Sequence, residues 1–68
     1  SRFQEMVQEE LHISPTYRVT KTEGKDHNKT FWVEALINTE SAGIGSGKSK
    51  QEAEQHAAQN ALENRGKI

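Results

Sequence analysis

The hydrophobic residues of the segment 1–11, SRFQEMVQEEL, recur at helical spacing and predict an amphipathic helix. Gln4, Glu5 and Gln8 lie on another face of the same helix. We expect the apolar stripe to face the core, and it consists of Phe3, Met6, Val7 and Leu11. Pro15 stops any continuation of the helix.

Residues 17–23 and residues 30–38 predict two strands. The first, YRVTKTE, is rich in β-branched and aromatic side chains. The second, TFWVEALIN, alternates between two faces. One face is expected to carry Phe31, Val33, Ala35 and Ile37, and the other Trp32, Glu34 and Leu36. The segment that follows the first strand, GKDHNKT, has the composition of a loop.

A third strand over residues 41–47 and a second helix complete the pattern. Thr39 and Glu40 are expected at the hairpin turn before this strand. Ser49 is a good N-cap residue, and Glu52, three residues later, predicts a capping box. The helix then repeats alanine at helical spacing, which allows close packing, and its stop signals are Asn64 and Gly66.

This order, α-β-β-β-α, predicts an α+β fold. We expect a two-layer sandwich, with a three-stranded antiparallel sheet and both helices packed on one face. The chain has 68 residues, enough for one small domain over residues 1–68. Because the sequence starts abruptly in a helical pattern, we expect a domain excised from a longer protein.

Composition narrows the function only slightly. The formal net charge is −1, so any basic patch must be local. There is no cysteine, which leaves no thiolate metal site and fits a cytoplasmic location. No apolar run has membrane-spanning length. His12, His27 and His56 fall on separate elements without ligand spacing, so no metal role is expected.

Residues 42–50, AGIGSGKSK, resemble a nucleotide-binding phosphate loop, but the match is incomplete. Ala42 stands where the first glycine of that motif belongs. A P-loop hydrolase also needs a parallel sheet with crossover helices, and these strands are spaced for hairpins. We therefore expect Gly43 and Gly45 to let the third strand pack closely under a helix.

Lys48 and Lys50 flank the predicted start of the second helix. A helix N-terminus carries partial positive charge and free N–H groups, so it attracts phosphate. The two lysines would strengthen that attraction for phosphates presented along a polymer. This segment alone leaves an alternative open, in which both lysines are ordinary solvated surface charges.

The motifs together closely resemble the double-stranded RNA-binding domain, and within it the C-terminal domain of bacterial ribonuclease III. They are RFQEMVQ at the start, PTYRV before the first strand, EG-x-x-HNKTFWVE across the loop, and G-x-G-x-GKSK-x-EAEQ-x-AA into the second helix. The resemblance covers nearly the whole chain. It implies contacts with two successive minor grooves of duplex RNA and with the phosphates between them.

Three contact regions follow from this resemblance. The polar face of the first helix would meet one minor groove with Gln4, Glu5 and Gln8. The loop would enter the next minor groove with Gly24, Lys25 and His27. The start of the second helix would contact phosphates with Lys48, Ser49, Lys50 and Gln51.

Two positions depart from the family's pattern. Lys25 stands where the family often has proline directly after the glycine, and it adds a positive charge to the loop. Gln51 stands where family members often carry a further lysine. Glutamine can hydrogen-bond a phosphate but releases no counterion, so we expect weaker and less salt-sensitive binding than in a fully basic version.

The resemblance also implies a larger enzyme. The whole protein would be an endoribonuclease that cuts duplex RNA with magnesium, whereas this domain would need no cofactor and hold no catalytic residue. The isolated domain would be a monomer, and the full protein a homodimer through its catalytic part. Another possibility remains open, namely an RNA-binding fold used mainly for protein contacts. The near-neutral charge and Gln51 favour it. The residues that oppose it are Gln4, Gln8, His27, Lys48 and Lys50.

Overall fold

The computed structural model describes residues 1–66 and has the predicted order of elements, α-β-β-β-α. Its elements are α1 (Arg2–Leu11), β1 (Thr16–Glu23), β2 (Thr30–Ile37), β3 (Glu40–Gly47) and α2 (Lys50–Gly66). The three strands form one antiparallel sheet in the order β1-β2-β3. The predicted α+β fold class is therefore confirmed.

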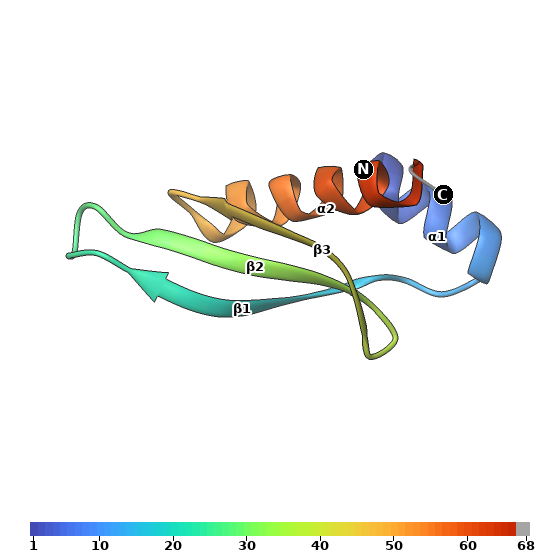
Figure 1. Ribbon diagram of the computed structural model, residues 1–68, viewed down its shortest axis with the longest axis horizontal. Helices are drawn as coiled ribbons and strands as arrows, with labels where there is room; N and C mark the ends of the chain where they lie inside the picture. Colours follow the sequence, from blue (N-terminus) through green and yellow to red (C-terminus); the bar gives the residue numbers. More distant parts are fainter. Residues whose placement is uncertain (67–68) are drawn as a thin grey trace.

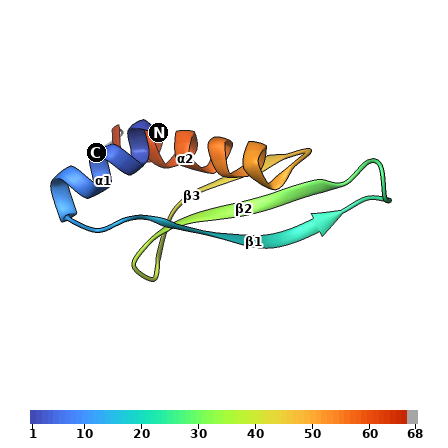
Figure 2. The ribbon, with the colours of Figure 1, turned by 180° about the vertical axis from the view of Figure 1, so that it is seen from behind.

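Both helices lie on one side of the sheet (Figure 1). Helix α2 runs along β3 and β2, and α1 packs beside the C-terminal half of α2. The view from behind shows the same arrangement, and no helix of the described residues lies on the opposite side of the sheet (Figure 2). We call this uncovered side of the sheet the open face. The chain is elongated, with principal extents of 40 × 20 × 18 Å.

The core is small and is built largely from alanine. Its largest fully buried side chains are Phe3, Val7 and Val33. Burying each of these side chains contributes roughly 1.5–3 kcal/mol relative to exposure. They are joined by buried alanines of β2 and α2, which are Ala35, Ala53, Ala57, Ala58 and Ala61. The predicted inward face of β2 is confirmed, with Phe31 and Ile37 partly buried at its ends.

Glycines in β3 allow α2 to approach the sheet closely. A Cβ atom at Gly45 would lie 2.2 Å from the backbone nitrogen of Ala57, and one at Gly43 would lie 2.5 Å from that of Ala61. Neither position has room for a side chain. The prediction that these glycines serve helix packing is confirmed, and the segment forms an antiparallel strand where a P-loop would need a parallel one.

Several details differ from the predictions, and one is that α2 continues through Asn64, a predicted stop signal, to Gly66. Leu11 was expected in the core but is 44% exposed, because it lies in the last turn of α1 and borders an open hollow beside Ile37 and Ala42. The hairpin turn lies one residue earlier than expected, since Glu40 already belongs to β3. Asn38 takes φ 57° in this turn, a left-handed conformation that asparagine tolerates better than most residues.

The open face carries both charged and apolar side chains. Ile44 is 54% exposed there, while Trp32 and Leu36 are partly covered by their neighbours. Trp32 lies opposite the core face of β2, as predicted, and pairs across the sheet with Lys21 and Ser46. The Trp32 indole nitrogen is buried and has no hydrogen-bond partner among residues 1–66.

Candidate nucleic-acid interface

Helix α1 presents the first group of predicted contact residues. The Ser1 hydroxyl caps the helix by accepting from the backbone N–H of Gln4 at 3.3 Å. Because Phe3 and Val7 face the core, Gln4, Glu5 and Gln8 are exposed. The side-chain amide of Gln8 donates to the Ser14 hydroxyl at 2.9 Å, and its amide oxygen remains able to accept from a ligand.

The loop between β1 and β2 extends beyond the N-terminal end of α2 (Figure 1). Gly24 begins it with φ 99°, and a Cβ atom there would lie 2.3 Å from the carbonyl oxygen of Asn28. The N–H of Asn28 donates to the carbonyl of Lys25 at 2.7 Å and closes the turn. Lys25 and His27 are both exposed. A tight turn therefore forms although Lys25 replaces the family's proline.

The junction between β3 and α2 holds the third group. The Ser49 hydroxyl accepts from the N–H of Glu52 at 3.1 Å, which makes Ser49 the predicted N-cap. The Glu52 carboxylate accepts from the N–H of Lys48 at 3.1 Å. A reciprocal capping box would use the N–H of Ser49 itself, so that part of the prediction is wrong by one residue. The Glu52 carboxylate thus binds the backbone N–H of the residue before the N-cap, Lys48.

The start of α2 is suited to binding an anion. The first N–H groups of a helix have no acceptor within the helix, and the helix dipole places partial positive charge there. Lys48 and Lys50 are exposed on either side of Ser49 in the chain. The Lys48 ammonium donates to the Thr30 hydroxyl at 3.4 Å, which connects the start of α2 with the end of the β1–β2 loop.

A shallow hollow of about 250 Å³ lies between α1 and α2. Gln4 and Gln51, which belong to separate sequence motifs, both line this hollow. Its other lining residues are Ser1, Tyr17, Glu54, Gln55 and Ala58. The structure therefore places the first and third contact regions next to each other, although they are far apart in the sequence.

Tyr17 supplies a neutral hydroxyl to this hollow. Burial raises the pKa of Tyr17 above its usual value, a hydrogen bond with Ser1 opposes this shift, and the Glu54 carboxylate adds to it. The phenol therefore stays protonated at neutral pH and keeps its donor. Tyr17 and Gln55 were not among the predicted site residues. The available signal was the spacing of Gln55, one helical turn after Gln51.

The charged side chains divide into two groups. On the open face, Arg18 pairs with Glu34, and Lys21 pairs with Glu23 at 3.4 Å. At the far end of the helices, Arg65 pairs with Glu10 at 2.8 Å. Within residues 1–66 the remaining cations form no ion pair with a carboxylate, and they are Arg2, Lys25, Lys29, Lys48 and Lys50.

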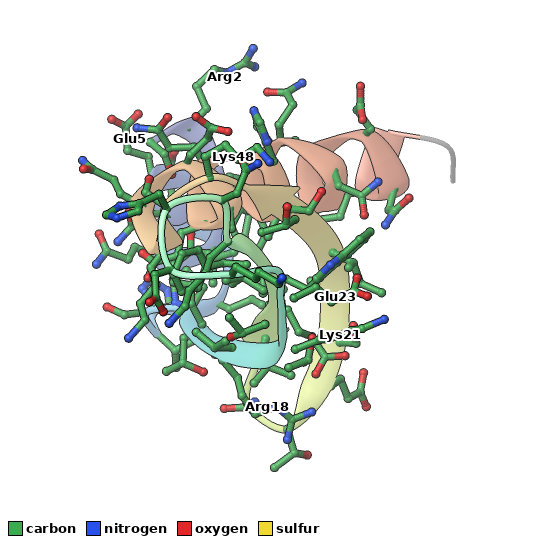
Figure 3. All side chains as sticks on the ribbon, turned by 90° about the vertical axis from the view of Figure 1, so that its left-hand side faces the viewer. Arg2, Glu5, Arg18, Lys21, Glu23 and Lys48 are labelled. Atoms are coloured by element: carbon green, nitrogen blue, oxygen red, sulfur yellow. The ribbon has the colours of Figure 1, made fainter. Side chains whose placement is uncertain are left out.

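Figure 3 shows this division from the end of the molecule that carries the loop. Arg2, Glu5 and Lys48 lie on the side of the helices, whereas Arg18 and Lys21 lie lower, toward the sheet. The hydroxyl of Ser41 and the Arg18 guanidinium lower the pKa of Glu34, so this carboxylate stays charged and keeps its pairing with Arg18. Arg18, the cation of this pair, is therefore less available to a polyanion.

All ten predicted site residues are exposed. The structure brings Gln4 close to Gln51, and Lys48 close to the end of the loop. The loop itself stands away from α1, so it forms a separate part of the surface (Figure 1). We call the three regions together the helix-and-loop surface, and its members are Gln4, Glu5, Gln8, Gly24, Lys25, His27, Lys48, Ser49, Lys50 and Gln51.

Among residues 1–66, no group of three or more histidine, cysteine, aspartate or glutamate residues could hold a metal ion. No described helix is both long and apolar enough to cross a membrane.

Comparison with known proteins gives a consistent result. The family model described as "Double-stranded RNA binding motif" matches residues 1–65. A protein named "Ribonuclease 3" from Oceanobacillus iheyensis is 46% identical over 63 residues, which cover 93% of this chain and 28% of that protein. A "Ribonuclease 3" from Natranaerobius thermophilus is 53% identical over 55 residues, covering 81% of this chain and 24% of that protein. The chain therefore spans about a quarter of the length of these relatives.

Proposed function

The chain belongs to the double-stranded RNA binding motif family, and we propose that it binds duplex RNA through the helix-and-loop surface. Binding would depend on the shape of the duplex, its 2′-hydroxyls and its phosphates, with little base preference. The observation that carries this proposal is the division of charge. The cations without carboxylate partners among residues 1–66 include every lysine of the helix-and-loop surface, in a chain whose net charge is −1.

Helix α1 would contact a minor groove. The wide, shallow minor groove of duplex RNA displays 2′-hydroxyls, each of which can donate and accept a hydrogen bond. The amides of Gln4 and Gln8 can do the same, and Glu5 can accept from a hydroxyl. DNA lacks this hydroxyl, so these contacts would distinguish RNA from DNA. The neighbouring Gln51 and Gln55 extend the same polar surface onto α2.

The β1–β2 loop would contact a second minor groove. Gly24 and the hydrogen bond between Asn28 and Lys25 shape a tight turn in the loop that contains His27. This loop extends beyond the body of the domain (Figure 1). Family domains span about 16 base pairs, so their contacts must be distributed along the molecule. The longest dimension of this chain, 40 Å, and the protruding loop support such a distribution.

The start of α2 would contact the phosphates between the two grooves. The major groove of duplex RNA is too narrow for side chains to read, so its phosphates are the accessible groups there. Lys48 and Lys50 would supply charge, and the N–H groups of the first turn of α2 would supply donors. Ser49 would contribute as the cap that organises this turn, and Gln51 by hydrogen bonding without counterion release.

We further propose that the domain is the RNA-binding part of an endoribonuclease similar to its relatives. Because the chain spans only about a quarter of their length, the catalytic residues, magnesium and homodimerisation would belong to the rest of such a protein. The isolated domain would be a monomer without a cofactor, in a cytoplasmic enzyme. The alternative, a fold used mainly for protein contacts, gains no support from the family match or from the lysines without carboxylate partners.

A titration with nucleic acid tests the proposed function. The probes are an RNA duplex of about 20 base pairs, DNA of the same sequence, and the single RNA strands. We expect the RNA duplex to bind roughly tenfold more tightly than either control at low salt, or better. Equal affinity for RNA and DNA duplexes would remove the role proposed for the 2′-hydroxyls, and no binding of RNA at low salt would overturn the function itself.

A further inference from the structure

A row of polar side chains on α2 covers the outer edge of β3. Because β3 pairs with no strand but β2 within residues 1–66, its other edge would leave backbone groups without partners. The side-chain amide of Asn64 donates to the carbonyl of Ala42 at 3.1 Å. The side-chain oxygen of Asn60 accepts from the N–H of Ile44 at 2.8 Å. One turn earlier in α2, a ring nitrogen of His56 lies 2.6 Å from the carbonyl oxygen of Ser46.

The spacing of the row matches the spacing of the strand. His56, Asn60 and Asn64 recur every fourth residue, which corresponds to about 6 Å along a helix. Their partners in β3 recur every second residue, which corresponds to about 6.8 Å along an antiparallel strand. The partners are Ser46, Ile44 and Ala42, so α2 and β3 run in opposite directions. One helix can therefore serve successive outward groups of the strand.

Close packing brings the row within reach of the strand. Gly43 and Gly45 pair with β2, and their missing side chains would point toward α2. A Cβ atom at Gly45 would lie only 2.7 Å from the carbonyl oxygen of Ala53. Since the helix backbone lies against the strand, short asparagine side chains suffice to reach the β3 edge.

The other edge of the sheet is arranged differently. Strand β1 has a bulge between Val19 and Lys21, where its pairing with β2 shifts register. The same strand carries the exposed ion pair of Lys21 with Glu23. Bulges and charges are common protections of an exposed edge. The register between β3 and β2 shifts in the first half of β3, between Ser41 and Gly43. The segment from Gly43 to Gly47 has no bulge and carries no charged side chain. That segment therefore depends on the row for its protection.

We propose that the row His56–Asn60–Asn64 prevents β3 from pairing with the β3 strand of a second copy of this chain. Edge strands with free N–H and C=O groups add further strands readily. The open face beside this edge exposes Ile44, which a second strand would partly cover. The row thus keeps the domain from self-association through its sheet, a property that does not depend on the proposed function.

The test replaces all three members of the row by alanine, as His56→Ala, Asn60→Ala and Asn64→Ala together. The matched control is Gln55→Ala, Gln59→Ala and Glu63→Ala, three exposed positions of the same helix. Sedimentation equilibrium measures self-association, and amide hydrogen exchange follows Ile44. We expect the self-association constant of the row variant to rise roughly tenfold or more over the control. Hydrogen exchange at Ile44 should slow as the protein concentration increases.

A folded row variant that stays as monomeric as the control would overturn the proposal. If the triple variant of the row does not fold, the single variant Asn60→Ala replaces it and Gln59→Ala replaces the triple control. The two single variants are compared under conditions in which the same fraction of each protein is folded. Greater self-association of Asn60→Ala, with concentration-dependent protection of Ile44, supports the proposal. Equal self-association of the two single variants contradicts it.

Discussion

The helix-and-loop surface and the open face both carry basic side chains, but they differ in whether these side chains form ion pairs. On the open face, Arg18 forms an ion pair with Glu34, and Lys21 forms one with Glu23. On the helix-and-loop surface, the lysines at the start of α2 have no carboxylate partner among residues 1–66. Net charge therefore says little about binding to a polyanion here, since the distribution of ion pairs decides which cations are available.

The two sides of the sheet also differ in how tightly they are packed, and Gly45→Val should show this most strongly. A side chain at Gly45 would collide with the backbone of Ala53 and Ala57, so we expect a loss of roughly 3 kcal/mol in the free energy of unfolding. The control, Ile44→Val, changes the neighbouring residue on the open face and should cost well under about 1 kcal/mol. Urea denaturation of both variants measures the difference. Equal losses would mean that α2 does not pack as described.

Lys50→Ala and Arg18→Ala compare the two surfaces in RNA binding. We expect Lys50→Ala to weaken binding to all RNA duplexes roughly tenfold, because it removes a charge-assisted phosphate contact. The slope of log affinity against log salt should fall by about 1. Arg18→Ala should leave both quantities unchanged, since Arg18 is paired on the open face. RNA affinities of both variants at several salt concentrations measure these effects. If the two variants have the same affinity and the same salt slope, the third contact region is misassigned.

His27→Ala should weaken RNA binding without a change in the salt slope. A neutral minor-groove hydrogen bond is worth about 1 kcal/mol, which corresponds to roughly fivefold in affinity. Lys25→Ala in the same loop serves as the contrast, because the loss of a charge should lower the slope. Affinities measured at several salt concentrations separate the two effects. If His27→Ala changes only the slope, its proposed role is wrong.

Gln51→Lys should sharpen the difference between the two surfaces by adding a cation to the first turn of α2. If each phosphate contact contributes as much as it does on duplex DNA, one further contact would raise the slope of log affinity against log salt by about 0.9. We expect the affinity to rise a few-fold. Gln59→Lys adds the same charge at another exposed position of α2 and controls for net charge. The same salt titration measures both variants. An equal gain in the two would indicate a nonspecific charge effect.

The fold could be predicted from local patterns because each element carries its own signal. Alternation marked the two faces of β2, and the spacing of Gly43 and Gly45 marked close packing under α2. Leu11 was misplaced because helical spacing cannot tell where the core ends along a helix. The hairpin turn was misplaced by one residue because Asn38, and not Thr39, adopts the left-handed conformation.

The site was only partly accessible from sequence. The resemblance supplied the ten residues of the helix-and-loop surface, but not their partners. Pairing of Arg18 with Glu34 depends on the register between β1 and β2. The contacts of Asn60 and Asn64 with β3 depend on how α2 crosses the sheet. Such relations join residues far apart in the chain, so no local pattern reveals them.

Nuclear magnetic resonance during titration with an RNA duplex of about 20 base pairs tests most directly which surface binds. We predict that signals from Gln4, His27 and Lys50 shift together and saturate at the same RNA concentration. Signals from Trp32 and Ile44 on the open face should remain nearly unchanged. Saturable shifts confined to Trp32, Ile44 and their neighbours, with Gln4, His27 and Lys50 unaffected, would contradict binding through the helix-and-loop surface.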